Sequence, residues 1–107
     1  MSPITTHILD ISSGRPAAGI PVTLEFQTAG AWEMLAQSAT DGDGRARNLL
    51  PADHRLASGL YRLRFETGEV SAFFPEIEIR FRVDKPEQHY HVPLLLSAYG
   101  YTTYRGS

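Results

Sequence analysis

The sequence of 107 residues contains no cysteine, which excludes disulfide bonds and any reaction that uses a thiolate as the nucleophile. It also lacks a surplus of basic residues, since ten Lys and Arg stand against twelve Asp and Glu. The resulting formal charge of −2 offers no electrostatic basis for binding nucleic acid or an anionic membrane surface. We therefore expect neither nucleic acid nor a membrane among the partners.

Long apolar runs are absent as well, because no segment approaches the roughly 20 apolar residues that cross a bilayer. The first residues show neither the basic start nor the apolar stretch of a secretory signal, so a cytoplasmic protein is expected. The Gly-x-Ser-x-Gly turn and the glycine-rich loop that holds phosphate groups are also missing. The length suits one domain, which we expect to span residues 1–107.

What the sequence does contain is a series of short segments in which apolar and polar residues alternate, separated by turn-forming residues. In residues 20–27, for example, Val22, Leu24 and Phe26 fall on one face of a strand. Further strands are expected at residues 4–10, 32–40, 59–67, 76–83, 89–97 and 101–105, with a short segment at 45–50. At most one helical turn is expected, at residues 69–72. The pattern predicts an all-β fold, either a sandwich or a barrel.

Histidines are the side chains best suited to proton transfer, because an unperturbed imidazole titrates at a pKa of about 6.5. The chain has four: His7, His54, His89 and His91. His89 and His91 lie two residues apart in an expected strand, so their side chains should share a face. Three interpretations are open: surface or hydrogen-bonded core histidines, general acid–base catalysis, or a metal site. In the last case His89, His91 and a distant histidine would supply three nitrogen ligands.

Arg45 directly follows the turn Asp41-Gly42-Asp43-Gly44. This turn has too few acidic positions for an EF-hand calcium loop, and the closing glutamate of such a loop is missing. Arg45 is therefore either a solvated arginine after a hairpin turn or a planar cation fixed at the turn's exit. In the second case it could bind a carbonyl oxygen or an anion. The pattern alone does not choose between the two.

Four longer motifs together span nearly the whole chain. They are THILDISSGRPAAGIPVTLEF near the start, TDGDGR and FFPEI in the middle, and HYHVPLLLSAYGYTTYRGS at the end. The chain resembles the transthyretin-related proteins, specifically the 5-hydroxyisourate hydrolases. The closing Tyr-Arg-Gly-Ser is the most specific element of this resemblance, because it separates the hydrolases from the transthyretin hormone carriers.

The resemblance implies a transthyretin-like sandwich of two β-sheets, with seven to eight strands and at most one short helix. It also implies a homotetramer whose active sites lie in a central channel, at the dimer–dimer interface. The implied reaction is the hydrolysis of 5-hydroxyisourate to 2-oxo-4-hydroxy-4-carboxy-5-ureidoimidazoline in urate degradation, with no cofactor and no metal. The stretch between Thr67 and Phe73 is shorter than in many relatives, where it carries a helix.

Carried over by motif, the resemblance implies catalytic roles for His7, Arg45 and His91. It implies substrate contacts from the same His7 and Arg45 together with Tyr104, Ser107 and His89. Tyr104 and Ser107 would point to opposite faces of a regular strand, so the end must bend at Gly106 or a neighbouring subunit must supply one of them. Two alternatives are a transthyretin-type carrier of small ligands and a zinc-binding β-sandwich protein that uses His7, His89 and His91.

Overall fold

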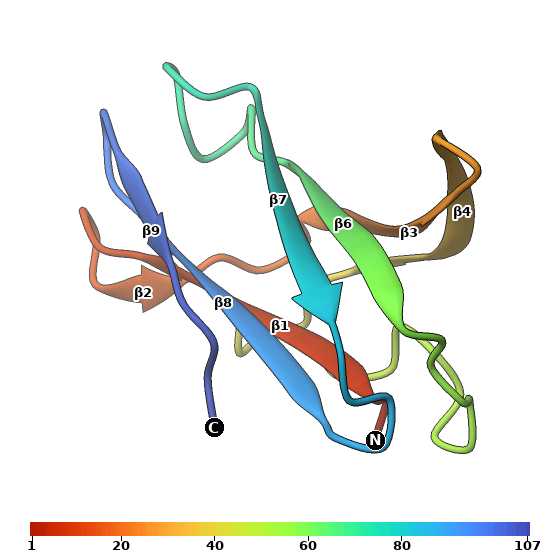
Figure 1. Cartoon of the computed structure of the whole chain (residues 1–107). Helices are drawn as coiled ribbons and strands as arrows, with labels where there is room; N and C mark the ends of the chain where they lie inside the picture. The colour runs from red at the N-terminus through yellow and green to blue at the C-terminus, as the bar shows by residue number, and fades with distance from the viewer.

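The computed structural model describes all residues from Met1 to Ser107 and contains nine β elements (Figure 1). Seven of them have at least three residues: β1 (Ile4–Asp10), β3 (Pro21–Thr28), β4 (Ala31–Ala39), β6 (Gly59–Glu66), β7 (Glu76–Val83), β8 (Tyr90–Leu96) and β9 (Tyr101–Thr103). Two consist of two residues each, β2 (Arg15–Pro16) and β5 (Arg45–Ala46). No helix that could cross a membrane occurs in the structure.

The strands form two sheets that face each other. One has the order β2-β1-β8-β9, with the short β5 also paired to β1, and the other has the order β4-β3-β6-β7 (Figure 1). The β1–β8 pair is parallel, whereas every other pair is antiparallel. The parallel pair brings a segment near the N-terminus beside one near the C-terminus, and both chain ends lie at the same end of the sandwich.

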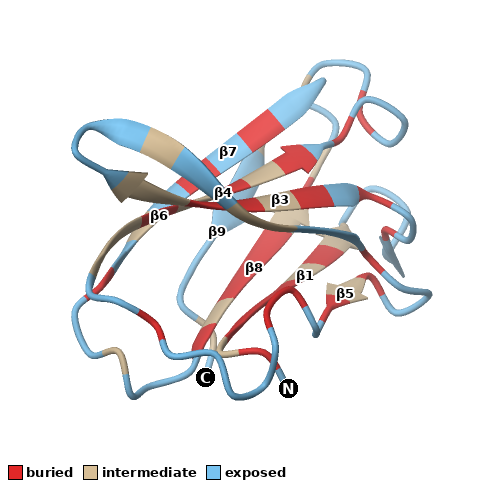
Figure 2. Cartoon of the chain, turned by 90° about the vertical axis from the view of Figure 1, so that its right-hand side faces the viewer, coloured by how far each residue is buried: buried red, intermediate tan, exposed pale blue.

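A single hydrophobic core fills the space between the sheets and contains 20 buried side chains. Along β7, for example, buried residues recur among exposed ones, as the red and pale blue bands of Figure 2 show. In β6, Tyr61, Leu63 and Phe65 are buried, while Arg62 and Arg64 point away from the core. Alternation with a period of two is the pattern of a strand that packs on one face, so the predicted all-β sandwich is confirmed.

The predicted strands agree with the observed ones to within a few residues, with one difference of detail. Arg15–Pro16, where no strand was predicted, forms β2 by pairing with Leu9 and Asp10. The stretch after β6 makes one hydrogen-bonded turn, in which Val70 and Ser71 donate to the Thr67 carbonyl, in agreement with the prediction of at most one helical turn.

The C-terminal segment is held along β8 rather than frayed (Figure 1). β9 pairs with residues 94–96 of β8. The ladder then breaks at Pro93, which has no N–H to donate, and resumes where the Gly106 N–H donates to the His91 carbonyl at 2.8 Å. The antiparallel register is the same on both sides of the break. Leu94 pairs with Thr103, and three residues further along each strand His91 pairs with Gly106, so neither strand gains or loses a residue.

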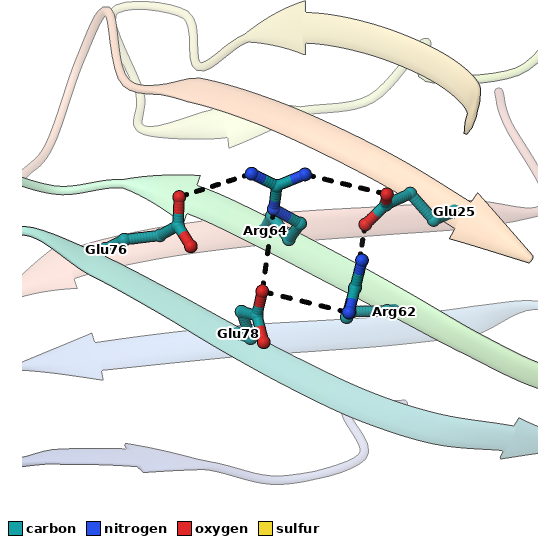
Figure 3. Close-up of polar contacts among 5 residues, drawn as sticks. All are labelled: Glu25, Arg62, Arg64, Glu76 and Glu78. Atoms are coloured by element: carbon teal, nitrogen blue, oxygen red, sulfur yellow. Dashed lines mark hydrogen bonds and ion pairs between the residues drawn. The ribbon is translucent and has the colours of Figure 1, made fainter. Parts of the chain in front are cut away.

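The outer face of the four-stranded sheet carries a network of five charged side chains (Figure 3): Glu25, Arg62, Arg64, Glu76 and Glu78. Its centre is Glu25, whose carboxylate lies 2.8 Å from Arg62 Nε and 3.6 Å from an Arg64 nitrogen. The Trp32 ring covers the Arg62 guanidinium at 4.3 Å. The hydrogen bond from Arg62 lowers the pKa of Glu25, so the carboxylate is ionised at neutral pH.

Replacing Glu25 with alanine is expected to destabilise the fold by about 1–3 kcal/mol, because it removes the hydrogen-bonded partner of the largely buried Arg62. Glu78→Ala is the matched control. Glu78 is more exposed and its nitrogen–oxygen distances are 3.6 Å or longer, so its loss should cost at most about 1 kcal/mol. Urea denaturation measures both variants. Equal losses in the free energy of unfolding for the two variants would show that the burial of Glu25 does not strengthen its ion pairs.

Candidate active site

The candidate site lies on the outer face of the five-stranded sheet, where β1, β5 and β8 are adjacent. Ile4, Thr6 and Ile8 of β1 point into the core, so Thr5 and His7 point outward. In the ladders, His7 stands opposite Arg45 of β5, and Thr5 stands opposite His91 of β8. Directly paired residues project on the same side of a sheet, so His7, Arg45 and His91 share this face.

The turn at residues 41–44 fixes Arg45 at this position. The Asp41 carboxylate accepts hydrogen bonds from the N–H groups of Asp43 and Arg45, at 2.9 and 3.0 Å. Gly44 has φ = +75° and donates to the Asp41 carbonyl, while its own carbonyl accepts from Ile8 of β1. A Cβ at Gly44 would lie 2.6 Å from the Ile8 carbonyl oxygen, so only glycine allows β5 to approach β1 this closely.

Arg45 is left free to bind a ligand because Arg47 neutralises the acidic turn. Arg47 forms ion pairs with Asp41 at 3.3 Å and with Asp43 at 3.6 Å. Arg45 itself makes no ion pair and no side-chain hydrogen bond in the chain, and it is half-buried. Of the two interpretations of Arg45, a planar cation fixed at the turn's exit therefore fits the geometry.

His89 and His91 share a face, as their spacing predicts, and their rings are nearly parallel at an interplanar angle of 14°. Both contact the hydroxyl of Thr5, which lies 2.8 Å from His91 Nδ1 and 3.1 Å from His89 Nε2. Thr5 is 4% exposed, His91 is half-buried and His89 is exposed. No residue of the chain hydrogen-bonds His91 Nε2, so this nitrogen is available to water or a substrate.

These groups border a cavity of about 180 Å³. Its lining combines cations, imidazoles and hydroxyls: Met1, Thr5, Thr6, Arg45, Arg47, His89, His91 and Ser107. His7 lies on the same face but does not line this cavity. A larger hollow of about 730 Å³ adjoins it at His89 and reaches His54, but it contains neither Arg45 nor His91. We place the site in the smaller cavity because Arg45 and His91 line it together.

Both site histidines are biased toward the neutral form. Burial lowers the pKa of His7, and the positive charge of Arg45 lowers it further, against opposing effects of Asp43 and Asp41. Burial likewise lowers the pKa of His91, followed by the effects of Arg45, His89 and His7. Neutral imidazoles beside an unpaired arginine can accept protons at neutral pH while the arginine stabilises negative charge.

The lowered pKa values predict that the protein loses stability as the pH falls below about 6.5, the unperturbed value for histidine. In that range the unfolded chain binds protons at residues 7 and 91 that the folded chain does not, so acid favours unfolding. NMR titration of the ring protons should place the midpoints of His7 and His91 below that value. Midpoints above it would contradict the electrostatic description of the site.

The tail reaches the site through two residues that act differently. The Arg105 guanidinium stacks 4.2 Å from the Tyr90 ring centroid and donates to the His89 carbonyl and to Gln88, so it anchors the tail to β8. Gly106 lies against the His91 ring, where an added Cβ would be 2.5 Å from the ring carbon Cδ2. The absence of a side chain at Gly106 therefore allows the observed position of the His91 imidazole.

Gly106→Ala is expected to lower turnover by about 10²-fold while the melting temperature changes little. The new methyl group collides with a side chain rather than with backbone, so the His91 ring must rotate away from Thr5. Gly42→Ala is the control, because a Cβ at Gly42 meets nothing within 4 Å. Steady-state kinetics and a thermal melt of the same preparations measure both effects. Full activity in the Gly106 variant would mean that the ring position is unimportant.

Of the two C-terminal residues predicted to contact the substrate, one lies at the cavity and the other does not. Ser107 lines the cavity together with Arg45 and His91. Tyr104 is 55% exposed and borders a separate hollow between β7 and the tail, so one chain does not bring it into the cavity. As the alternation along a strand predicts, Tyr104 and Ser107 do not face the same cavity, and Ser107 is the one that lines the candidate site.

Thr5 and Gly106 were not among the residues proposed from the sequence. The only sequence signal for Thr5 is its spacing of two from His7, which puts both on one face of a strand. The structure does not gather three histidine, aspartate or glutamate side chains into a group able to hold a metal ion, so His7, His89 and His91 do not converge as ligands.

Comparison with known proteins identifies the family. Residues 4–106 match the model of the HIUase/Transthyretin family. The chain belongs to this family. Among its relatives, the 5-hydroxyisourate hydrolase of Caulobacter vibrioides is 48% identical over 117 residues, which cover all of both chains.

Solved structures with this fold include a 5-hydroxyisourate hydrolase and a transthyretin. The 5-hydroxyisourate hydrolase of Klebsiella pneumoniae superposes with a TM-score of 0.81 and 34% identity, covering 97% of this chain and 98% of the other. Sea bream transthyretin in complex with thyroxine superposes with a TM-score of 0.86 and 32% identity, covering 97% and 94%. The hydrolase and the thyroxine-binding transthyretin therefore share the fold, so the fold alone does not distinguish their functions.

Proposed function

We propose that this chain hydrolyses 5-hydroxyisourate to 2-oxo-4-hydroxy-4-carboxy-5-ureidoimidazoline, a step in urate degradation. The observation that carries the proposal is the meeting of two neutral-biased histidines, His7 and His91, with the unpaired Arg45 on one face. The similarity to the Caulobacter vibrioides hydrolase along the whole chain supports the same activity.

In the proposed reaction, water attacks a ring carbonyl and the adjacent carbon–nitrogen bond opens. His91 Nε2 accepts a proton from the attacking water, because it lacks a partner in the chain while Nδ1 is held by Thr5. Arg45 stabilises the negative charge that develops on the carbonyl oxygen. The proton then passes from His91 to the departing nitrogen, which returns His91 to its starting state, and the second proton of the water is released to solvent when the new carboxylic acid ionises. His7, opposite Arg45, serves as the second acid–base group.

Substrate contacts are proposed for Ser107 and His89, which line the same cavity as Arg45. Tyr104 is proposed to contact the substrate from a neighbouring copy of the chain, since it lies outside this cavity in its own chain. A contribution from a neighbouring copy supports a homotetramer with sites at the dimer–dimer interface, as the resemblance implies. Sedimentation velocity should find a tetramer of 11.9-kDa chains. A fully active monomer would contradict the assembly.

A small-ligand carrier is the alternative that the test has to exclude, because sea bream transthyretin shares the fold and was solved with thyroxine. The two functions differ in stoichiometry. A hydrolase added at a hundredth of the substrate concentration accelerates the conversion of all the substrate to the ring-opened product. A carrier at that ratio leaves the rate of product formation at its uncatalysed value. Product formation followed by NMR makes the distinction.

A cytoplasmic location and a single domain over residues 1–107 are also part of the proposal.

A further inference from the structure

The Thr5 hydroxyl joins two histidines that the sequence separates from it by more than 80 residues. It lies 2.8 Å from His91 Nδ1 and 3.1 Å from His89 Nε2, both within hydrogen-bond range. Thr5 is 4% exposed, so water does not readily replace either partner. The parallel pairing of β1 with β8 creates this contact by setting Thr5 opposite His91.

The hydroxyl has one proton to donate and two lone pairs that accept. It therefore cannot donate to both rings at once, and at least one of the two contacting ring nitrogens must carry a proton. If Thr5 donates to His89 Nε2, it accepts from His91 Nδ1–H, and His91 Nε2 is a bare nitrogen that can act as a base. If Thr5 donates to His91 Nδ1, it accepts from His89 Nε2–H, and His91 Nε2 carries the proton and can act as an acid.

We propose that Thr5 is a positioning residue that couples His91 to His89, so that the proton on His89 Nε2 decides whether His91 presents a base or an acid to the substrate. The catalytic consequence rests on the proposed hydrolase function, whereas the coupling itself does not. His89 is exposed and exchanges protons with solvent, while His91 is half-buried beside Arg45. The pair thus links the site to bulk solvent through one hydroxyl.

During turnover the coupling keeps the positive charge away from Arg45. As His91 Nε2 takes a proton from water, its Nδ1 proton moves to Thr5 Oγ, and the Thr5 hydroxyl proton moves to His89 Nε2. His91 ends neutral, with its proton on Nε2, and the charge resides on His89. When His91 donates that proton to the departing nitrogen, the two transfers reverse and restore the starting state, so protons balance over the cycle.

Other charged groups surround the pair without contacting these ring nitrogens. They are His7 from β1, Arg45 from β5, Arg47 in the cavity, Arg105 from the tail, and His54, Arg55 and Glu87 around the hollow beside His89. After burial, the charges of Arg45, His89 and His7 contribute to the lowered pKa of His91, but no residue other than Thr5 hydrogen-bonds a nitrogen of either ring. The tautomer of His91 should therefore follow Thr5 and His89.

The test is nitrogen-15 NMR of the imidazoles in the full-length protein without substrate, recorded as a function of pH. In the wild type, His91 Nδ1 should change from protonated to bare as His89 gains its Nε2 proton. Thr5→Val should abolish this linked change, and Thr5→Ser should preserve it because serine keeps the hydroxyl. A His91 tautomer that ignores His89 in the wild type, or that still follows it in Thr5→Val, would overturn the proposal.

His89→Ala provides an independent check in case Thr5→Val is poorly folded, since His89 is exposed. In His89→Ala, Thr5 has only His91 as a partner, and the His91 tautomer should no longer change at the pH where wild-type His89 titrates. In kinetics, Thr5→Val should lower kcat by about 10–100-fold, the range found when the hydrogen-bond partner that orients a metal-binding histidine is removed. The acid limb of its pH profile should then coincide with the titration of His91 instead of His89.

The outcomes separate this inference from the proposed function. A linked tautomer change in a protein that does not hydrolyse 5-hydroxyisourate would retain the coupling and refute the hydrolase. Hydrolysis by a protein without the linked change would retain the hydrolase and refute the coupling.

Discussion

Replacing His91 with asparagine is expected to lower kcat/KM for 5-hydroxyisourate by about 10²–10⁴-fold, the usual contribution of a positioned general base. The asparagine amide can still hydrogen-bond the Thr5 hydroxyl where His91 Nδ1 does, at 2.8 Å in the wild type. It has nothing at the position of Nε2, however, so it cannot take a proton from water. The strand pairing of β8 does not depend on this side chain, and the melting temperature should change little.

His54→Asn is the matched control for that variant. His54 is exposed, lies outside the cavity that contains Arg45, and makes no side-chain hydrogen bond. Its replacement should leave both kinetics and stability unchanged. A well-folded His91 variant that keeps wild-type kcat/KM, or a His54 variant with an equal loss, would place the chemistry elsewhere on the molecule.

The second large effect is expected at Arg45. Arg45→Ala should lower kcat by about 10²–10³-fold, the cost found when one group that stabilises an oxyanion is removed. Arg45→Lys should restore only part of the loss, because lysine supplies the charge but not the planar set of donors. Arg15→Ala is the control, since Arg15 is exposed in β2 and its side chain makes no ion pair.

The two Arg45 variants also separate charge from geometry. The positive charge of Arg45 contributes to the lowered pKa values of His7 and His91, after burial. Both pKa values should therefore rise in Arg45→Ala and stay close to the wild type in Arg45→Lys. If Arg45→Lys kept wild-type turnover, the guanidinium fork would be dispensable and Arg45 would act as a point charge.

The sequence was sufficient to predict the strands because their signal is local. Along β6 and β7 every second residue is apolar and faces the core, and this pattern is visible in the residues themselves. β2 escaped prediction because a two-residue strand has no periodicity, and it forms only because β1 is beside it. The single turn after β6 fits the short segment between Thr67 and Phe73.

The site was predicted in part. Motif resemblance pointed to His7, Arg45 and His91, and the β1 ladders bring the three onto one face. Thr5 could not be singled out, because its role depends on the parallel alignment of β1 with β8, which joins residues far apart in the sequence.

Gly106 and Arg105 illustrate a second limit of the sequence. The close contact between Gly106 and the His91 ring requires the tail to keep its register past Pro93, which interrupts the ladder. The anchoring of Arg105 on the Tyr90 ring keeps the tail in place. Neither contact follows from local periodicity, so residue type alone could suggest only that Gly106 allows a bend.

The most direct test of the proposed function is the decay of 5-hydroxyisourate generated in situ by urate oxidase, measured with increasing amounts of the protein. The decay rate constant should rise in proportion to protein concentration, and the product should be the ring-opened carboxylate. The His91→Asn variant at the same concentrations should leave the rate near that of the uncatalysed reaction. A decay rate that does not change with wild-type protein, or that rises equally with the His91 variant, would contradict the proposed activity and its site.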